Sequence, residues 1–469
     1  MRNKFLKSII NKPPKLSKIS QEALLKLDDD QFSELKQIVI KRNKMKFQSR
    51  VAKKLGRKLL FKRFPNKRRE HIFHEKSKIY DMFRRYKYSD ILDFFNSRRA
   101  SLWKQGKDRT KSLTESIEIQ NFSFIDYPNE TLELFYKFAE YEPYLLDARA
   151  NFIDEHIADI SPYLLWGIIK KEMYPYIKGG DIHSRVSNVL KGLDLNKFMQ
   201  MSFTYADDRN IIALPPIWKP QRDLIEGQKI TTLEVGATNL VNKINEWLCR
   251  LYPPMGLSEE GQRYVTSFVV EILENAQRHS IRDAEGNWYM TAFMEFRNNQ
   301  YFCCLAFINT GMPIYDSIFE TDNPEVKKEL LYYISSHKSI NSNVLSTVYA
   351  LQDGSTRQNY KDSRGGVGMM RMVKFINEIG DTEIEDYKPQ ISIITGNVCI
   401  HFDKKYRNAV KLDDHRNYQW FNEYQDRKYA PEREYAFILK KTFPGTIITT
   451  RFCLDAESLI KKAKNDENH

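Results

Sequence analysis

The stretch that decides the fold is Glu271-Ile-Leu-Glu-Asn-Ala-Gln-Arg-His-Ser280, which closes an apolar helix that we expect over residues 258–278. The carboxylate of Glu271 and the carboxamide of Asn275 lie four positions apart, and residues at that spacing share one face of a helix. A carboxylate can accept a proton from water, and an amide oxygen can ligate a divalent cation. The pair is therefore suited to the hydrolysis or transfer of a phosphoryl group.

Two glycine-containing segments follow this helix, Asn309-Thr-Gly-Met-Pro-Ile314 and Arg364-Gly-Gly-Val-Gly-Met369. We expect the first to end a strand and the second to open a helix over residues 369–379. Glycines allow backbone amides to approach an anion closely, and the positive end of a helix dipole attracts the same anion. The second segment is therefore a candidate phosphate contact.

In this order and spacing the three segments resemble the N, G1 and G2 boxes of the GHKL superfamily of ATP-binding domains, over about residues 230–455. The resemblance implies an α/β sandwich in which a mixed sheet carries helices on one face. It implies ATP as ligand and Mg as cofactor, with Glu271 as general base and Asn275 as the metal ligand. Gly366 and Gly368 match the glycines whose backbone amides meet the nucleotide phosphates.

The adenine pocket is where the sequence departs from the family pattern. Asn309 replaces the usual aspartate that reads the adenine amino group, and its side-chain carbonyl can accept the same hydrogen bond without charge. Pro313 replaces the second glycine of the G1 box and lacks an amide donor, whereas Gly311 is kept. Thr446, after Gly445, resembles the threonine at the floor of the pocket. We therefore expect nucleotide contacts from Asn309, Gly311 and Thr446, with lower affinity or a looser base preference.

The resemblance identifies residues 315–363 as an ATP lid. A segment this long inside a compact domain is expected to be functional or mobile, and a helix is predicted at residues 324–336. We expect the lid to close over ATP and to present Arg364, with Arg357 or Lys361 as further candidates, to the terminal phosphate. The simpler interpretation is that these cations are solvated loop charges.

Composition limits the class of protein. A chain of 469 residues with 41% hydrophobic residues is long enough for two to four domains and can bury substantial cores. Its five cysteines show neither a zinc-site spacing nor an even number, which argues against a disulfide framework. No apolar run approaches the roughly 20 residues that a membrane helix needs. We expect a cytoplasmic protein without membrane partners.

The positive charge is concentrated at one end of the chain. Residues 1–110 hold 32 Lys and Arg against 11 Asp and Glu, a net charge of +21, whereas the whole chain has +13 and the remainder therefore −8. Clustered cations gain affinity for nucleic acid by releasing condensed counterions. Nucleic acid is one candidate partner of residues 1–115; solvated helical faces or an acidic partner are the alternatives.

Residues 116–202 alternate between β-prone and helical runs, which predicts an α/β layer with parallel pairing. Within it, Leu145–Asp154 and Val189–Phe198 look like parts of a STAS domain, the anti-anti-sigma fold. The resemblance implies a docking scaffold for a protein partner. His156 stands where phosphorylatable members have a serine, so we do not expect regulation by serine phosphorylation at that position.

The sequence thus predicts five parts in order: a basic helical region (1–115), a STAS-like α/β domain (116–202), a Pro-containing linker (203–229), a GHKL ATP-binding domain (230–455) and a polar C-terminal tail (456–469). Within the GHKL part we expect helices at 237–251 and 258–278, a hairpin of strands at 288–297 and 301–309, and strands at 390–396, 398–403 and 446–454.

Three function classes remain open on these residues. The first is an ATPase whose lid closure and homodimerisation control its contacts with partners or nucleic acid. The second is an anti-sigma-type serine protein kinase, since the ending His279-Ser280 is similar to that group. The third is a non-enzymatic nucleic-acid or partner-binding protein with a degenerate nucleotide site, which Asn309 and Pro313 support.

Overall fold

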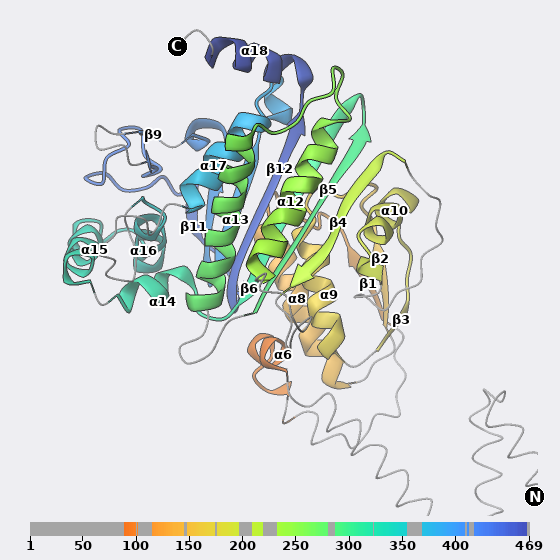
Figure 1. The fold of residues 1–469 in the computed structure, drawn as a ribbon. Helices are drawn as coiled ribbons and strands as arrows, with labels where there is room; N and C mark the ends of the chain where they lie inside the picture. The colour runs from red at the N-terminus through yellow and green to blue at the C-terminus, as the bar shows by residue number, and fades with distance from the viewer. Residues whose placement is uncertain are drawn as a thin grey trace, which may run out of the picture. The chain divides into compact units, whose positions relative to one another are not determined.

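A seven-stranded antiparallel sheet forms the centre of the described structure (Figure 1). The strands follow the spatial order β11-β8-β7-β12-β6-β5-β4. Their bounds are β4 (Ile211–Trp218), β5 (Asn287–Arg297), β6 (Gln300–Thr310), β7 (Gln390–Thr395), β8 (Val398–Phe402), β11 (Ala436–Ile438) and β12 (Gly445–Leu454). The strands expected at 288–297, 301–309, 390–396, 398–403 and 446–454 are confirmed within two residues.

The computed structural model describes residues 89–99, 101, 115–144, 148–173, 176–196, 209–218, 232–279, 287–321, 323–353, 368–408, 410–411 and 417–466. These residues all belong to one compact unit that begins at Tyr86. Most of the expected basic region lies outside the described residues; its described part includes the helix α6 (Asp90–Phe95).

Two short turns determine the direction of the strands. Asn298 and Asn299 join β5 to β6 with φ angles of 51° and 61°, the positive values that a type I′ hairpin turn requires. β7 and β8 are likewise an antiparallel hairpin that turns at Gly396. β12 enters between β6 and β7, which run in the same direction, and is antiparallel to both. The described sheet is therefore antiparallel throughout, and the expectation of a mixed sheet was wrong.

One face of the sheet is covered by α12 (Thr232–Leu248), α13 (Glu259–His279) and α17 (Gly368–Ile379) (Figure 1). Their apolar faces pack into a single core, in which the rings of Phe268 and Phe375 lie 5.3 Å apart. Helices were expected at these three places, and the prediction is confirmed.

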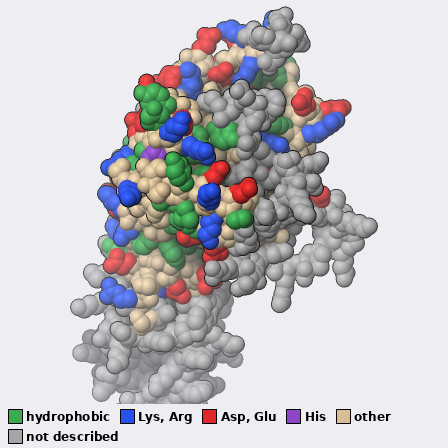
Figure 2. Space-filling view, turned by 90° about the vertical axis from the view of Figure 1, so that its left-hand side faces the viewer, with side chains coloured by type: hydrophobic (Ala, Val, Ile, Leu, Met, Phe, Trp, Pro, Cys, Tyr) green, Lys and Arg blue, Asp and Glu red, His purple; other side chains and the backbone are tan. Residues whose placement is uncertain are grey.

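The segment between β6 and α17 folds largely as helices, α14 (Ile314–Phe319), α15 (Pro324–Ser336) and α16 (Ser342–Ala350). The side chain of Asn323 caps α15 by accepting hydrogen bonds from the backbone amides of Glu325 and Val326. Residues 354–363 of the expected lid lie outside the described residues. Figure 2 faces the side of the molecule that carries α15 and α16, and basic and acidic side chains are interspersed over it.

The second face of the sheet is covered by α8 (Pro128–Tyr141) and α9 (Ser161–Glu172). These helices belong to a layer with a parallel sheet of β1 (Glu115–Ile119), β2 (Ala148–Phe152) and β3 (Ile177–Gly179), followed by α10 (Ser184–Gly192). The expected parallel pairing is confirmed. The expectation of helices on only one face of the large sheet was wrong.

The residues of β6 explain why two covers are needed. Cys303, Leu305 and Phe307 belong to the core under α12 and α13, while Cys304, Ala306 and Ile308 belong to the core under α8 and α9. Both sides of the strand are apolar, and each must be removed from water. One continuous core therefore crosses the expected boundary between residues 116–202 and 230–455.

Two segments expected to be irregular contain regular structure. The linker at 203–229 includes β4, which pairs with β5 and has a register shift between Leu214 and Ile217. The two prolines at this shift are tolerated because β4 is an edge strand, where missing amide donors break few ladder bonds. The expected polar tail begins with α18 (Ala456–Asp466).

The remaining short elements are η1 (Glu142–Tyr144), η2 (Glu385–Tyr387), η3 (Lys404–Tyr406), β9 (Val410–Lys411) and β10 (Asn417–Tyr418).

All five cysteines are free, in agreement with the expected absence of a disulfide framework. Within the part of the chain that the structure describes, no helix has both the length and the apolar character needed to cross a membrane.

A buried carboxylate joins the two layers. Asp159 is fully buried and accepts hydrogen bonds from the Phe124 amide at 2.7 Å, the Ser161 amide at 2.8 Å and the Thr449 hydroxyl at 2.5 Å. Burial raises the pKa of Asp159, and these donors oppose the shift. The bonds tie the loop before α8, the start of α9 and the strand β12 to one side chain.

We predict that Thr449→Val destabilises the protein by about 1–3 kcal/mol, because it removes one donor from a buried carboxylate. The neighbouring Thr450→Val is a matched control, since the Thr450 hydroxyl is buried without a hydrogen-bond partner among the described residues. Its replacement should be neutral or stabilising. Urea unfolding of both variants measures the difference; equal free energies of unfolding would show that the Asp159 bond contributes nothing.

Candidate functional site

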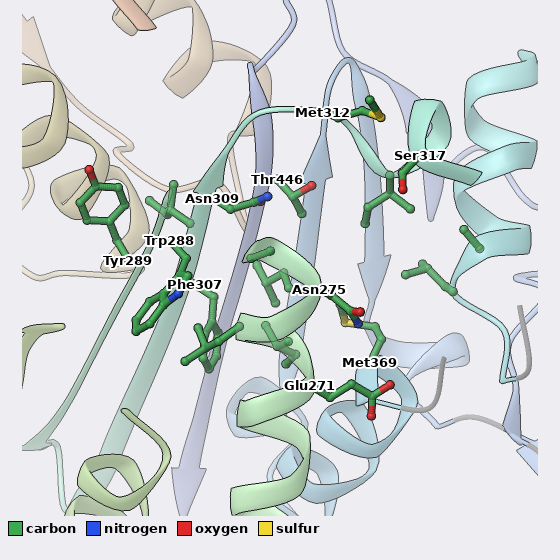
Figure 3. Close-up of a pocket in the computed structure, with 18 of the residues that line it drawn as sticks. Glu271, Asn275, Trp288, Tyr289, Phe307, Asn309, Met312, Ser317, Met369 and Thr446 are labelled. Atoms are coloured by element: carbon green, nitrogen blue, oxygen red, sulfur yellow. The ribbon is translucent and has the colours of Figure 1, made fainter. Parts of the chain in front are cut away.

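A cavity of about 170 Å³ lies between α13, three strands of the large sheet and the α14–α16 segment (Figure 3). Four of the residues predicted from the sequence line this one cavity: Glu271, Asn275, Asn309 and Thr446. They come from three segments that lie far apart along the chain. The fold therefore brings together residues that the sequence analysis identified separately.

Glu271 and Asn275 occupy successive turns of α13 and extend to the same side of the helix (Figure 3). The neighbouring Ile272 and Leu273 are buried in the core and fix the rotation of the helix. Glu271 is half-buried and Asn275 is exposed, so the pair lies at the border of the apolar face. This position leaves both side chains accessible to a ligand in the cavity.

Asn309 and Thr446 face each other across two neighbouring strands, since they are register partners in β6 and β12. The Thr446 hydroxyl lies 2.9 Å from the Thr395 hydroxyl, which also accepts a hydrogen bond from the Ile314 amide at 2.8 Å. A hydroxyl has one donor and two acceptor positions. When Thr395 donates to Thr446, the Thr446 hydrogen is available to a ligand.

Sequence reasoning missed Thr395 because only strand pairing reveals its role. Thr395 lies directly opposite Thr446 in the β7–β12 ladder. Its sequence signal is slight, a threonine before the glycine turn that follows β7.

Two glycines allow the backbone at this end of the sheet to pack closely. Gly445 has a φ of 138°, and a Cβ atom added to it would lie 2.1 Å from the carbonyl oxygen of Asn309. Gly311 has a φ of 146°, and its amide donates to the carbonyl oxygen of Pro444 at 2.9 Å. Gly311 therefore holds the β6 end against the start of β12, next to the cavity residue Met312.

The remaining walls of the cavity are mainly apolar. They are supplied by aromatic, aliphatic and thioether side chains, among them Trp288, Phe307, Met312, Ile318 and Met369. Such walls favour a flat apolar group, while a few polar atoms fix its orientation. Asp316 also lies on α14 but does not line the cavity. Burial raises the pKa of its carboxyl group, and the nearby charge of Glu320 raises it further.

The expected phosphate-binding residues are only partly within the described structure. Gly368 is the first residue of α17, and the following Met369 lines the cavity, so this helix begins beside it. Arg364 and Gly366 lie outside the described residues, as do Arg357 and Lys361. Their roles in phosphate binding stay predictions.

The described residues offer few metal ligands. Among them, no group of three or more His, Cys, Asp and Glu side chains is placed to hold a metal ion. Glu271 and Asn275 nevertheless supply carboxylate and amide oxygens at one mouth of the cavity. This donor set fits Mg²⁺, which keeps several waters and is usually bound through one or two protein ligands plus phosphate oxygens.

Comparison of the chain with protein-family models, with curated proteins and with solved structures finds no match. The functional conclusion therefore depends on the residues and geometry of the cavity.

We predict that Gly445→Ala lowers the free energy of unfolding by about 1–3 kcal/mol, because the new methyl group collides with the Asn309 backbone in a conformation reserved for glycine. Gly179→Ala is the control, since a Cβ there meets no atom within 4 Å. Chemical denaturation of both variants checks the prediction, and an unchanged stability of Gly445→Ala would contradict the close approach.

Proposed function

We propose that the protein binds ATP in the cavity beside α13 and hydrolyses it with a divalent cation, in the manner of GHKL-type ATPases. One observation carries the proposal: Glu271, Asn275, Asn309 and Thr446 line a single cavity although they were selected from separate motifs. A chance resemblance of the three motifs would not require these side chains to meet.

The enclosed part of the cavity suits the base of a nucleotide. Its volume of about 170 Å³ is below the 300–1,000 Å³ of typical small-molecule pockets, so it fits a ring system while the rest of the ligand extends outward. Asn309 and Thr446 provide hydrogen-bonding groups at its floor, and apolar walls sandwich the ring. The sugar and phosphates then lie toward Asn275, Glu271 and the start of α17.

Asn275 and Glu271, at the mouth of the cavity, are suited to two different roles. The Asn275 oxygen is suited to ligate a phosphate-bound Mg²⁺ ion, whose charge offsets the charge developing on the phosphates. The Glu271 carboxylate, one helical turn away, is suited to accept a proton from an attacking water. The amino end of α17 adds a positive dipole near the phosphates.

The fold is compatible with this proposal. The cover of one sheet face by α12, α13 and α17 supports a helix-on-sheet arrangement of the GHKL kind, whereas the antiparallel strand direction and the second cover by α8 and α9 differ from the expected family pattern. The layer of residues 115–196, with its parallel β1-β2-β3 order, supports the proposed STAS-like resemblance. Because α8 and α9 pack on the large sheet, a protein partner would have to dock on other surfaces of this layer.

We predict that Glu271→Gln reduces ATP turnover by about 10²–10⁴-fold, because it removes the proton acceptor, while nucleotide affinity changes little. Purified full-length protein is incubated with ATP labelled in the terminal phosphate, and released phosphate is separated from phosphate retained on protein. Glu274→Gln, three residues further along α13 and outside the cavity lining, is the matched control.

Each result of this assay has a separate meaning. Turnover by Glu271→Gln at the parental rate would refute the general-base assignment. Label retained on the protein would favour the serine-kinase alternative. Calorimetry with Mg and ATP tests binding itself, and an absence of heat would refute the proposal for the cavity.

Nucleic-acid binding is a second proposal, and it rests on the charge of the amino-terminal residues. Residues 1–85 contain 26 Lys and Arg against 8 Asp and Glu, a net charge of +18. The region to remove in a test ends there, because α6 begins at Asp90 and packs into the core, and Arg99 is buried in an ion pair with Glu142 at 2.9 Å.

We predict that deletion of residues 1–85 weakens binding to duplex DNA or RNA and flattens its dependence on salt. Each phosphate that the shortened protein no longer neutralises should reduce the logarithmic slope by about 0.9. Fluorescence anisotropy over a range of salt concentrations provides the measurement. The deletion should leave ATP turnover intact as a control for folding. Unchanged affinity and slope would remove nucleic acid as the partner of this region.

A further inference from the structure

A second cavity, of about 340 Å³, lies at the opposite end of β12 from Thr446. Four segments meet around it: the loop after β2, the turn between β5 and β6, the η2 segment and the end of β12. It shares no lining residue with the cavity beside α13.

The charges lining this second cavity are predominantly positive. Arg297, Lys388 and Arg451 line it together with a single carboxylate, Asp386. Arg451 is already engaged, because both of its terminal nitrogens lie 2.6 Å from the carboxylate oxygens of Asp126. The Arg451 side chain is therefore held in place as part of the cavity wall. Arg297 and Lys388 are the candidates for contact with a ligand.

Arg297 and Lys388 are held less completely. One N–H group of Arg297 donates to the Ile157 carbonyl at 3.2 Å, and the carboxylate of Glu295 is 3.6 Å from the same guanidinium. The guanidinium also lies 3.5 Å from the centre of the Phe302 ring, which fixes its plane. Lys388 pairs at 2.6 Å with Glu385, whose side chain is 64% exposed. A surface pair of this kind contributes little and can be exchanged for a ligand.

His156 adds a polar group at the same wall. Its Nε2 atom lies 2.7 Å from Arg185, and its Nδ1 atom is buried without a hydrogen-bond partner among the described residues. Burial lowers the pKa of His156, and the charges of Arg297 and Arg185 lower it further. Glu155 opposes this shift, and His183 contributes to it. The imidazole of His156 therefore lies beside the positive charges of Arg297 and Arg185.

We propose that this cavity is a second ligand site, which binds the phosphate group of a small phosphorylated molecule. The planar fork of Arg297 matches a phosphate, and Lys388 supplies a point charge. Asn298 and Gln300 line the same wall with amide groups. The volume of about 340 Å³ exceeds that of the first cavity and reaches the size typical of pockets for small organic molecules. The site is independent of the proposed ATP site.

The experiment uses full-length protein and two probes, inorganic phosphate and glucose 6-phosphate, in isothermal titration calorimetry. Nucleotides are left out because they are expected in the first cavity. We expect saturable binding that Arg297→Gln weakens by about tenfold or more, since a charged hydrogen-bonding partner is removed. Lys388→Gln should act in the same direction. Arg433→Gln is the control, because Arg433 is exposed and donates to the Ser339 carbonyl outside both cavities.

A second measurement, the pKa of His156, does not depend on whether the substituted proteins fold. In the parent protein, a bound phosphate should raise the pKa of His156, measured by carbon-detected NMR of the histidine ring, and Glu271→Gln should retain this response. Stronger binding of the sugar phosphate identifies an organic ligand, and equal binding identifies free phosphate; both support a phosphate site. Absence of heat with both probes at millimolar concentration, or heat unaffected by Arg297→Gln and Lys388→Gln, would overturn the proposal.

Discussion

The central position of β12 is the constraint on which the rest of the structure depends. This strand completes both the β6 and the β7 ladders, and its two faces belong to two different cores. Its first residues form the floor of the cavity beside α13, its middle holds Asp159 through Thr449, and its last residues line the second cavity. A displacement of β12 would therefore disturb both layers and both cavities.

Much of the local structure could be predicted from the sequence, because local patterns determine it. The helix expected at residues 324–336 has those bounds in the structure, where proline and an asparagine cap fix its start. The Asn298-Asn299 turn sets the hairpin register without any distant contact. The grouping of Glu271 with Asn275 followed from helical spacing alone, and their meeting with Asn309 and Thr446 followed from the resemblance.

What could not be predicted depends on pairing between distant segments. Pro215 and Pro216 indicate a connector, and only the position of β4 at the sheet edge makes them compatible with a strand. The role of Thr395 likewise arises from its place opposite Thr446. The sequence does contain a signal for the second helical layer on the sheet. Residues 302–308 are continuously apolar instead of alternating, as expected for a strand that is buried on both sides.

The insertion of β12 also has a consequence for biosynthesis. More than 130 residues separate the end of β6 from the start of its partner β12. During translation, β6 and β7 are therefore both made before β12 leaves the ribosome. Until then the edges of β6 and β7 that face each other lack their shared neighbour, and unpaired apolar edges attract other chains. The two facing edges can therefore be paired only after the residues of β12 have been made and have entered between them.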